Sequence, residues 1–121
     1  MGGRLIGYMP DWRSESIHDN LEATAFVFRQ GDTEAVLVSA TVCVIQKELA
    51  EIIQKRVQKE LGIPADNVIV AATHTHSGPA TGIGIDWDYC NNIFIPQVTE
   101  AVKKAKENMQ AVTMGYAFGE H

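Results

Sequence analysis

Two histidines separated by one residue offer the clearest chemistry in this chain of 121 residues. They lie in residues 73–79, Thr-His-Thr-His-Ser-Gly-Pro, directly after a short apolar run. In extended backbone, residues i and i+2 point to the same side, so His74 and His76 are expected to project together. Such a pair can bind a divalent metal, or one imidazole can bind metal while the other acts on a substrate. Two hydrogen-bonding loop histidines explain this short spacing equally well.

Other polar residues near the pair have simpler interpretations. Ser77 lacks the Gly-x-Ser-x-Gly context of a nucleophile and should face away from the histidines, so a turn-forming or capping serine is favoured. Asp86 and Asp88 could form a carboxylate pair, although Asp88 fits a helix N-cap as well or better. His18, beside Asp19, is interpreted as a loop residue.

The elements that must position these residues begin with a predicted hairpin. Residues 21–28 alternate like a strand, residues 30–32 (Gln-Gly-Asp) indicate a turn, and residues 35–44 form a second, nearly continuous apolar run. Such a run is typical of a strand covered on both faces. The first twenty residues, rich in glycine and polar side chains, are expected to be irregular.

A helix over residues 46–61 and a short strand over residues 68–72 follow. Gly62 should end the helix, and the two strands that flank it should be parallel, as in a βαβ unit. The apolar residues that recur at helical spacing are Leu49, Ile52, Ile53, Val57 and Leu61.

After a long loop over residues 73–88, a second amphipathic helix is expected near residues 98–109. Pro96 should lie in its first turn, or kink a helix that starts nearer Tyr89. A last strand over residues 112–118 would complete a second βαβ unit. The fold class is therefore α/β: a mostly parallel sheet from two βαβ-like units with an added antiparallel hairpin strand. Lys103, Lys104 and Lys106 are interpreted as a solvated face.

Composition limits the classes of protein. A chain of 121 residues, with 45% hydrophobic and 21% charged residues, predicts one globular domain over 1–121. A net charge of −5 argues against nucleic-acid binding. We expect no transmembrane segment and see no signal peptide, so the default location is cytoplasmic. Cys43 and Cys90 make no disulfide framework, and Cys43, in an apolar run, is expected to be a buried, inert thiol.

The motif at residues 73–79 resembles that of the neutral ceramidases and the wider neutral/alkaline non-lysosomal ceramidase family. The resemblance extends over nearly the whole chain and matches the family's N-terminal region. Its flanking features are Gly7-Tyr8, Ile17-His18, Ala25-Phe26-Val27, Gly62-Ile63-Pro64, Asn67-Val68 and Gly119-Glu120.

The resemblance implies a zinc-dependent amide hydrolase of sphingolipid metabolism that cleaves the N-acyl bond of ceramide, a lipid amide. It implies that His74 is a zinc ligand, that His76 lies in the active site close to the substrate, and that Gly7 borders the site. Zinc would lower the pKa of a bound water and polarise the amide carbonyl, while the neighbouring imidazole hydrogen-bonds the developing charge.

Departures from the family pattern shape the expectation for this chain. Ala80-Thr81 replaces the usual Gly-Gly, and Thr24 stands where an arginine is frequent. The family's other zinc ligands lie downstream of the last residue, and neither His18 nor His121 matches them. We therefore expect the N-terminal portion of a larger catalytic domain, with an incomplete active site and weak or absent zinc.

Two further expectations concern association. A sheet taken from a larger protein leaves unpaired edges and apolar surface, which favours a homo-oligomer. The alternative function is a non-catalytic α/β module that acts by self-association or by binding another chain.

Overall fold

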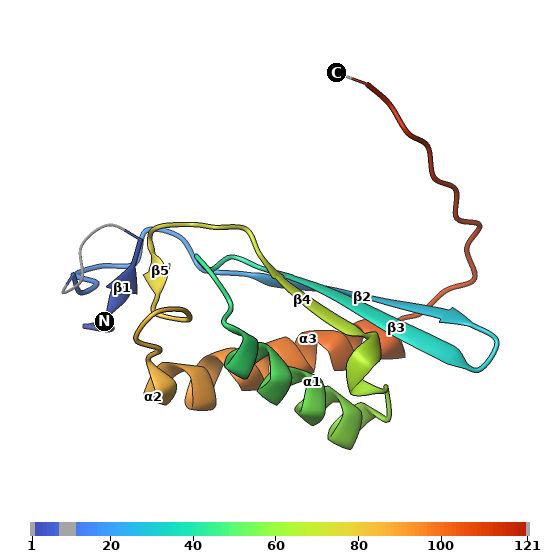
Figure 1. The fold of residues 1–121 in the computed structure, drawn as a ribbon, viewed down its shortest axis with the longest axis horizontal. Coiled ribbons are helices and arrows are strands. Elements are labelled where there is room, and N and C mark those ends of the chain that lie inside the picture. The colour runs from blue at the N-terminus through green and yellow to red at the C-terminus, as the bar shows by residue number, and fades with distance from the viewer. Residues whose placement is uncertain (1, 8–11, 121) are drawn as a thin grey trace.

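The computed structural model describes residues 2–7 and 12–120, so Tyr8 and His121, considered above, lie outside the described residues. A three-stranded sheet packs against a layer of helices, and a small strand pair lies at one end of it (Figure 1). The elements in chain order are β1 (Leu5–Ile6), β2 (Ala23–Gln30), β3 (Thr33–Ala40), α1 (Lys47–Leu61), η1 (Ala65–Asn67), β4 (Val68–Ala72), β5 (Gly78–Pro79), α2 (Trp87–Tyr89), η2 (Cys90–Phe94) and α3 (Ile95–Glu107).

The sheet has the order β2-β3-β4 and mixes two kinds of pairing. β2 and β3 form the predicted antiparallel hairpin, in register from Ala23 opposite Ala40 to Gln30 opposite Thr33. Gly31 has a φ of +58° in the turn between them, a conformation that glycine adopts without a steric cost. β3 and β4 are parallel and are joined through α1, which confirms the first βαβ unit.

The expected strand at residues 112–118 is wrong, and with it the second βαβ unit. This segment leaves α3 as an extended chain that runs away from the sheet (Figure 1). Tyr116 and Phe118 are 91% and 96% exposed. The alternating apolar pattern is typical of a strand, but a strand exists only where its backbone groups find a partner. One of the two pairings in the sheet is antiparallel, so the mostly parallel sheet is not confirmed.

The helix α1 confirms its predicted apolar face and its predicted end. Leu49, Ile53 and Val57 are fully buried against the sheet, whereas Ile52 is 36% exposed. Gly62 follows with a φ of +74°, and its N–H donates to the Gln58 carbonyl at 3.0 Å. This left-handed residue ends the helix in the way that glycine favours.

The second helical stretch begins earlier than residue 98 and is not regular. It runs from α2 through a π-helical turn, η2, into α3, with the Ile95 N–H bonded to the Cys90 carbonyl. Its N-cap is Asp86, whose carboxylate accepts the Tyr89 N–H at 3.0 Å, so the expectation of a cap at Asp88 is wrong. The widened turn directly precedes Pro96, whose ring would clash with a carbonyl in a regular turn.

The helices cover only one face of the sheet. Valines and alanines of all three strands point into the core against α1 and α3. The opposite face carries exposed apolar side chains, so the expectation that residues 35–44 are covered on both faces is wrong. β3 also ends at Ala40 rather than at residue 44. The exposed apolar residues of the outer face, which we call the outer patch, are Phe26, Phe28, Leu37 and Ile69.

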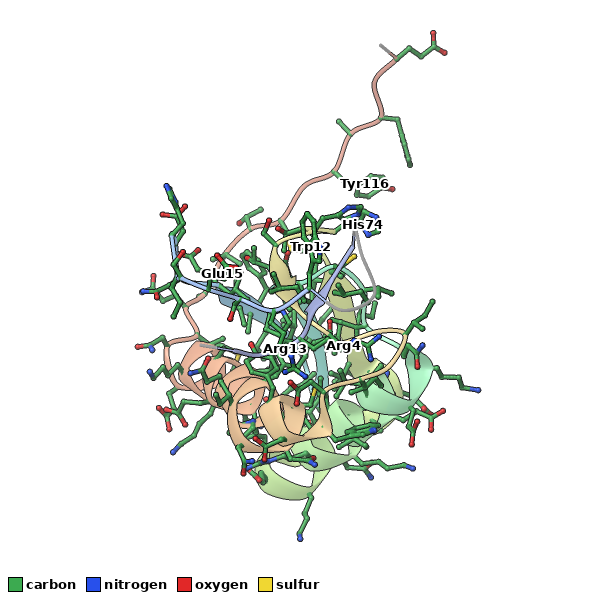
Figure 2. The ribbon with its side chains drawn as sticks, turned by 90° about the vertical axis from the view of Figure 1, so that its left-hand side faces the viewer. Arg4, Trp12, Arg13, Glu15, His74 and Tyr116 are labelled. Atoms are coloured by element: carbon green, nitrogen blue, oxygen red, sulfur yellow. The ribbon has the colours of Figure 1, made fainter. Side chains whose placement is uncertain are left out.

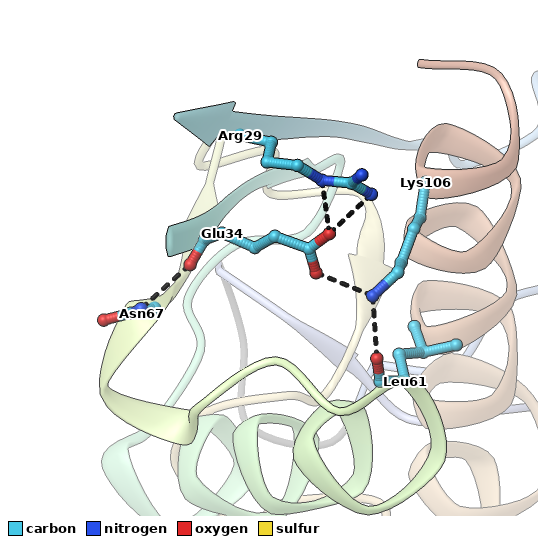
Figure 3. A network of polar contacts seen from close by, with 5 residues as sticks. All are labelled: Arg29, Glu34, Leu61, Asn67 and Lys106. Carbon is cyan, nitrogen blue, oxygen red and sulfur yellow. Dashed lines mark hydrogen bonds and ion pairs between the residues drawn. The ribbon is translucent and has the colours of Figure 1, made fainter. Parts of the chain in front are cut away.

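A polar network ties the far end of the sheet to both helices (Figure 3). Glu34 pairs with Arg29 at 2.7 Å and with Lys106 at 2.6 Å, and Lys106 also donates to the Leu61 carbonyl at 2.9 Å. Asn67 donates to the Glu34 carbonyl at 2.8 Å. The sequence context of Lys106 indicated a solvated face, and for this residue that interpretation is wrong. None of the helices among the described residues is long and apolar enough to cross a membrane.

Candidate active site

The two histidines of the motif follow the carboxyl end of β4, next to the chain that leaves β3. The Thr73 N–H donates to the Ala40 carbonyl, and the His74 N–H donates to the Val42 carbonyl, both at 3.0 Å. The two segments thus stay hydrogen-bonded beyond the regular strands. Figure 2 looks at this end of the molecule, where His74 and the N-terminal residues Arg4 and Trp12 lie.

His74 has a left-handed backbone, with a φ of +70°. Its Nδ1 lies 2.7 Å from the Cys43 carbonyl oxygen, so this nitrogen carries the proton and donates, which leaves a lone pair on Nε2. A left-handed histidine costs free energy, on the order of 1–3 kcal/mol, and persists only where its surroundings hold it. Here the two hydrogen bonds to residues 42 and 43 hold it.

The imidazoles of His74 and His76 meet, as the spacing predicted. Their Nε2 atoms lie 3.3 Å apart, and their ring centres lie 4.9 Å apart at an angle of 71°. The predicted reason is wrong, however, because β4 ends at Ala72 and His74 is not extended. His74 is exposed and His76 is half-buried.

Gly7 lies directly against His76. β1 pairs antiparallel with β5, with Ile6 opposite Gly78, which brings the N-terminal segment alongside the motif. A Cβ atom on Gly7 would lie 2.6 Å from the Cβ and Cγ atoms of His76, closer than any side chain tolerates. Gly7 also has a φ of +129°, so both its contact and its conformation favour glycine.

Cys43 is the site residue that the sequence did not indicate. Its buried Sγ lies 3.9 Å from the Nδ1 of His74. One candidate ligand atom from each of Cys43, His74 and His76 lies within 4.8 Å of the other two. The available signal was topological: the carboxyl ends of adjacent parallel strands meet at one edge of a sheet, and Cys43 follows β3 as His74 follows β4.

Thr81, one of the two residues that replace the Gly-Gly usual in the family, forms hydrogen bonds beside the site. Thr81 is fully buried, and its hydroxyl donates to the Val44 carbonyl at 2.6 Å. The Gln46 N–H in turn donates to the Thr81 carbonyl at 3.4 Å. The threonine therefore fixes the segment after β5 to the segment after β3, which carries Cys43.

The remaining candidates lie apart from this cluster or have other roles. Ser77 is exposed in a turn in which its N–H donates to the Thr75 hydroxyl at 3.3 Å. Asp86 caps a helix, and Asp88 accepts from Asn92 at 2.9 Å. His18 pairs with Asp19 at 2.7 Å, and both are exposed.

Comparison with known proteins identifies the class. The family model described as "Neutral/alkaline non-lysosomal ceramidase, N-terminal" matches residues 1–117, so the chain belongs to this family. Neutral ceramidase A of Dictyostelium discoideum is 38% identical over 81 residues, which cover 63% of this chain and 11% of that protein. Neutral ceramidase of Mycobacterium tuberculosis is 29% identical over 108 residues, covering 84% of this chain and 16% of that protein.

A further relative is Neutral ceramidase B of Dictyostelium discoideum, 32% identical over 135 aligned positions, covering 96% of this chain and 18% of that protein. The chain thus spans less than a fifth of the length of the curated relatives it matches. No solved structure matches the chain significantly.

Proposed function

We propose that this chain is the N-terminal portion of a ceramidase-like, zinc-dependent hydrolase of an N-acyl amide bond. The observation that carries the proposal is the meeting of the His74 and His76 imidazoles, with Nε2 atoms 3.3 Å apart, in a chain of this family. Residues 1–121 then form one α/β part of a larger catalytic domain. The names of the relatives point to ceramide as the class of substrate.

The residues present fit a divalent zinc ion. Because the Cys43 carbonyl accepts the Nδ1 proton of His74, the Nε2 atom carries no proton, and an unprotonated imidazole nitrogen is the form that binds metal. The zinc ion, when bound, polarises an amide carbonyl and favours ionisation of a water molecule. In this proposal His74 is a metal ligand.

His76 binds the substrate. Its imidazole lies beside His74 and is half-buried, so it can donate a hydrogen bond to an amide oxygen as negative charge develops there. Because Gly7 has no side chain, the His76 ring can lie next to it. The described residues supply no further histidine at this place, so the chain alone is not expected to turn over ceramide.

A chimeric enzyme tests the proposal. Residues of this chain would replace the matched region of Neutral ceramidase A, and hydrolysis of ceramide would be measured together with zinc content and thermal unfolding. We expect hydrolysis by the chimera, and a loss of at least a hundredfold in kcat for His74→Ala and His76→Ala. His18→Ala, which changes an exposed histidine away from the site, is the matched control.

Two results would contradict the proposal. One is a folded His74→Ala chimera with unchanged hydrolysis, which would remove the metal role of His74. The other is robust zinc-dependent hydrolysis by the 121-residue chain alone, which would contradict the incomplete site. The homo-oligomer stays a proposal as well, supported by the outer patch.

A further inference from the structure

Thr81 holds the segment between β3 and α1 in place. This segment, residues 41–46, is neither helix nor strand, so regular backbone pairing does not fix it. The Thr81 hydroxyl donates to the Val44 carbonyl at 2.6 Å, and the Gln46 N–H donates to the Thr81 carbonyl at 3.4 Å. Because Thr81 is fully buried, its hydroxyl makes this bond in an environment where a hydrogen bond is stronger than in water.

The chain on either side of this threonine is itself fixed. The Ala80 N–H donates to the Arg4 carbonyl at 3.0 Å, which ties the preceding residue to the N-terminal segment. A Cβ atom on Gly82 would overlap the Cγ1 of Val44, so the Val44 side chain packs directly on the Gly82 backbone. Residues 80–82 therefore hold Val44 through both its carbonyl and its side chain.

Val44 is joined by one peptide bond to Cys43, whose carbonyl orients the His74 ring. The Cys43 carbonyl accepts the His74 Nδ1–H at 2.7 Å, and the Val42 carbonyl accepts the backbone N–H of His74 at 3.0 Å. A displacement of residues 41–46 would change both bonds. Since His74 has a φ of +70°, which persists only where the surroundings hold it, loss of these bonds would release its backbone and its ring.

We propose that Thr81 is a positioning residue for His74. By fixing the Val44 carbonyl, it keeps the neighbouring Cys43 carbonyl where that oxygen accepts the His74 Nδ1 proton. The consequence for metal rests on the proposed function, in which the Nε2 atom of His74 is the ligand atom. Partners that orient a ligating histidine change metal affinity or activity by about 10–100-fold, and Thr81 acts one contact further away, so we expect the lower end of this range.

The tautomer of His74 in the metal-free 121-residue chain tests the positioning without any activity. The nitrogen NMR shifts of the ring show which nitrogen carries the proton, at a pH of about 8.5, where a histidine in water is uncharged. In wild type the proton should lie on Nδ1. Thr81→Val, which removes the hydroxyl at similar size, should shift the ratio of the two tautomers toward Nε2–H about fivefold or more, as expected for one lost hydrogen bond.

Two further variants at residue 81 keep the test independent of a single substitution. Thr81→Ser retains the hydroxyl and should restore the wild-type ratio. If Thr81→Val does not fold, Thr81→Ala removes the same hydroxyl without placing a methyl group against the Val44 carbonyl, and it should shift the ratio in the same direction.

Thr99 provides the matched control. It is also buried, at 3% exposure, and its hydroxyl donates to the Ile95 carbonyl at 2.8 Å inside α3, away from the histidines. Thr99→Val therefore removes a buried hydroxyl of the same kind. It should leave the His74 tautomer ratio as in wild type even if it lowers the melting temperature as much as Thr81→Val does.

The chimeric enzyme measures the consequence for metal. There Thr81→Val should bind zinc about tenfold more weakly, whereas Thr99→Val should not change the affinity. The two proposals can fail separately. A chimera without hydrolysis would contradict the proposed function and leave the tautomer result standing. An unchanged tautomer ratio in folded Thr81→Val, an equal shift in Thr99→Val, or a wild-type His74 with its proton on Nε2 would each overturn the role of Thr81.

Discussion

Gly7 shows how closely the N-terminal segment fits against the histidine pair. A Cβ atom there would lie 2.8 Å from the Cα of His76, as well as 2.6 Å from its side chain. A flexible side chain could move aside, but a backbone atom cannot do so without moving the whole turn. The position of His76 therefore depends on the absence of a side chain at residue 7.

Gly7→Ala should displace His76 and lower stability by more than about 1 kcal/mol, because alanine is strained at this positive φ and has no space. The free energy of unfolding by urea and the NMR signals of the His76 ring would measure both effects. Gly2→Ala is a matched control, since Gly2 also has a positive φ (+82°) but a Cβ atom there would meet nothing within 4 Å. Equal His76 signals in the two variants would contradict this fit.

The sequence could predict at this scale which histidines meet, but not how. Spacing alone favoured an extended His74, whereas contacts with residues 42 and 43, about thirty positions away, hold it in a left-handed conformation. Cys43 escaped prediction for the same reason. Its place in an apolar run indicated burial correctly, but its neighbours come from the chain after β4 and not from its own segment.

Helix α1 stabilises the sheet through one narrow face, so Ile53→Ala should cost about 2–5 kcal/mol, as for other deletions of large buried side chains. Ile53 is fully buried in the core cluster. The free energy of unfolding in urea is the measurement. Ile52→Ala, one position away and 36% exposed, should cost clearly less. Similar losses for both variants would mean that the helix buries a different face.

The network around Glu34 should make stability depend on pH. The hydrogen bond from Lys106, the charge of Lys106 and the contacts with Arg29 hold the pKa of the Glu34 carboxyl below its ordinary value of 4.5, although burial opposes this. A lowered folded-state pKa means that the stabilisation is fully present above the ordinary value. It is lost as the pH falls through the folded-state pKa.

Glu34→Gln should therefore lower the melting temperature at pH 7 and change it little at strongly acidic pH. Thermal melts across this range would test the sign. Glu51→Gln is the control, because Glu51 forms a looser, more exposed pair with Lys47 at 3.7 Å and such pairs contribute little. A constant difference between Glu34→Gln and wild type at all pH values would argue against an electrostatic origin.

Elements with a strong local pattern could be predicted, and those that depend on a partner could not. The hairpin, the face of α1 and its end at Gly62 follow from periodicity and turn residues. β1 and β5, with two residues each, carry no periodic pattern and exist because they pair with each other. The segment 112–118 is the reverse case, since it has the pattern of a strand but no pairing within the part of the chain that the structure describes.

On the scale of the whole molecule, the helices leave one face of the sheet open, and the outer patch lies there. Phe26 is 50% exposed and Ile69 is 62% exposed, on β2 and β4 respectively. Among the residues that the structure describes, β2 and β4 are also the two edge strands of the sheet. Exposed apolar surface next to free edges favours association.

The chain should therefore form a dimer at high micromolar concentration, as measured by light scattering. Phe26→Lys should shift the population toward the monomer, because it introduces a charge in the outer patch. Ile17→Lys changes an apolar residue of similar exposure, 68%, outside the patch, and should leave the dimer unchanged. A wild-type monomer at this concentration would contradict the prediction.

The π-helical turn at η2 also determines whether the helix can lose one residue without changing which of its faces is buried. Such a turn contains one more residue than a regular turn. Deleting one residue from a regular helix rotates all the residues that follow it by about 100° about the helix axis, which would turn the buried face away from its partner. Deletion of the exposed Asn91 would convert η2 into regular helix and keep the face of α3 that packs on β2. The regular turn would, however, bring a carbonyl against the ring of Pro96. The extra residue and the proline thus form a pair, and the helix tolerates loss of the residue only together with replacement of Pro96.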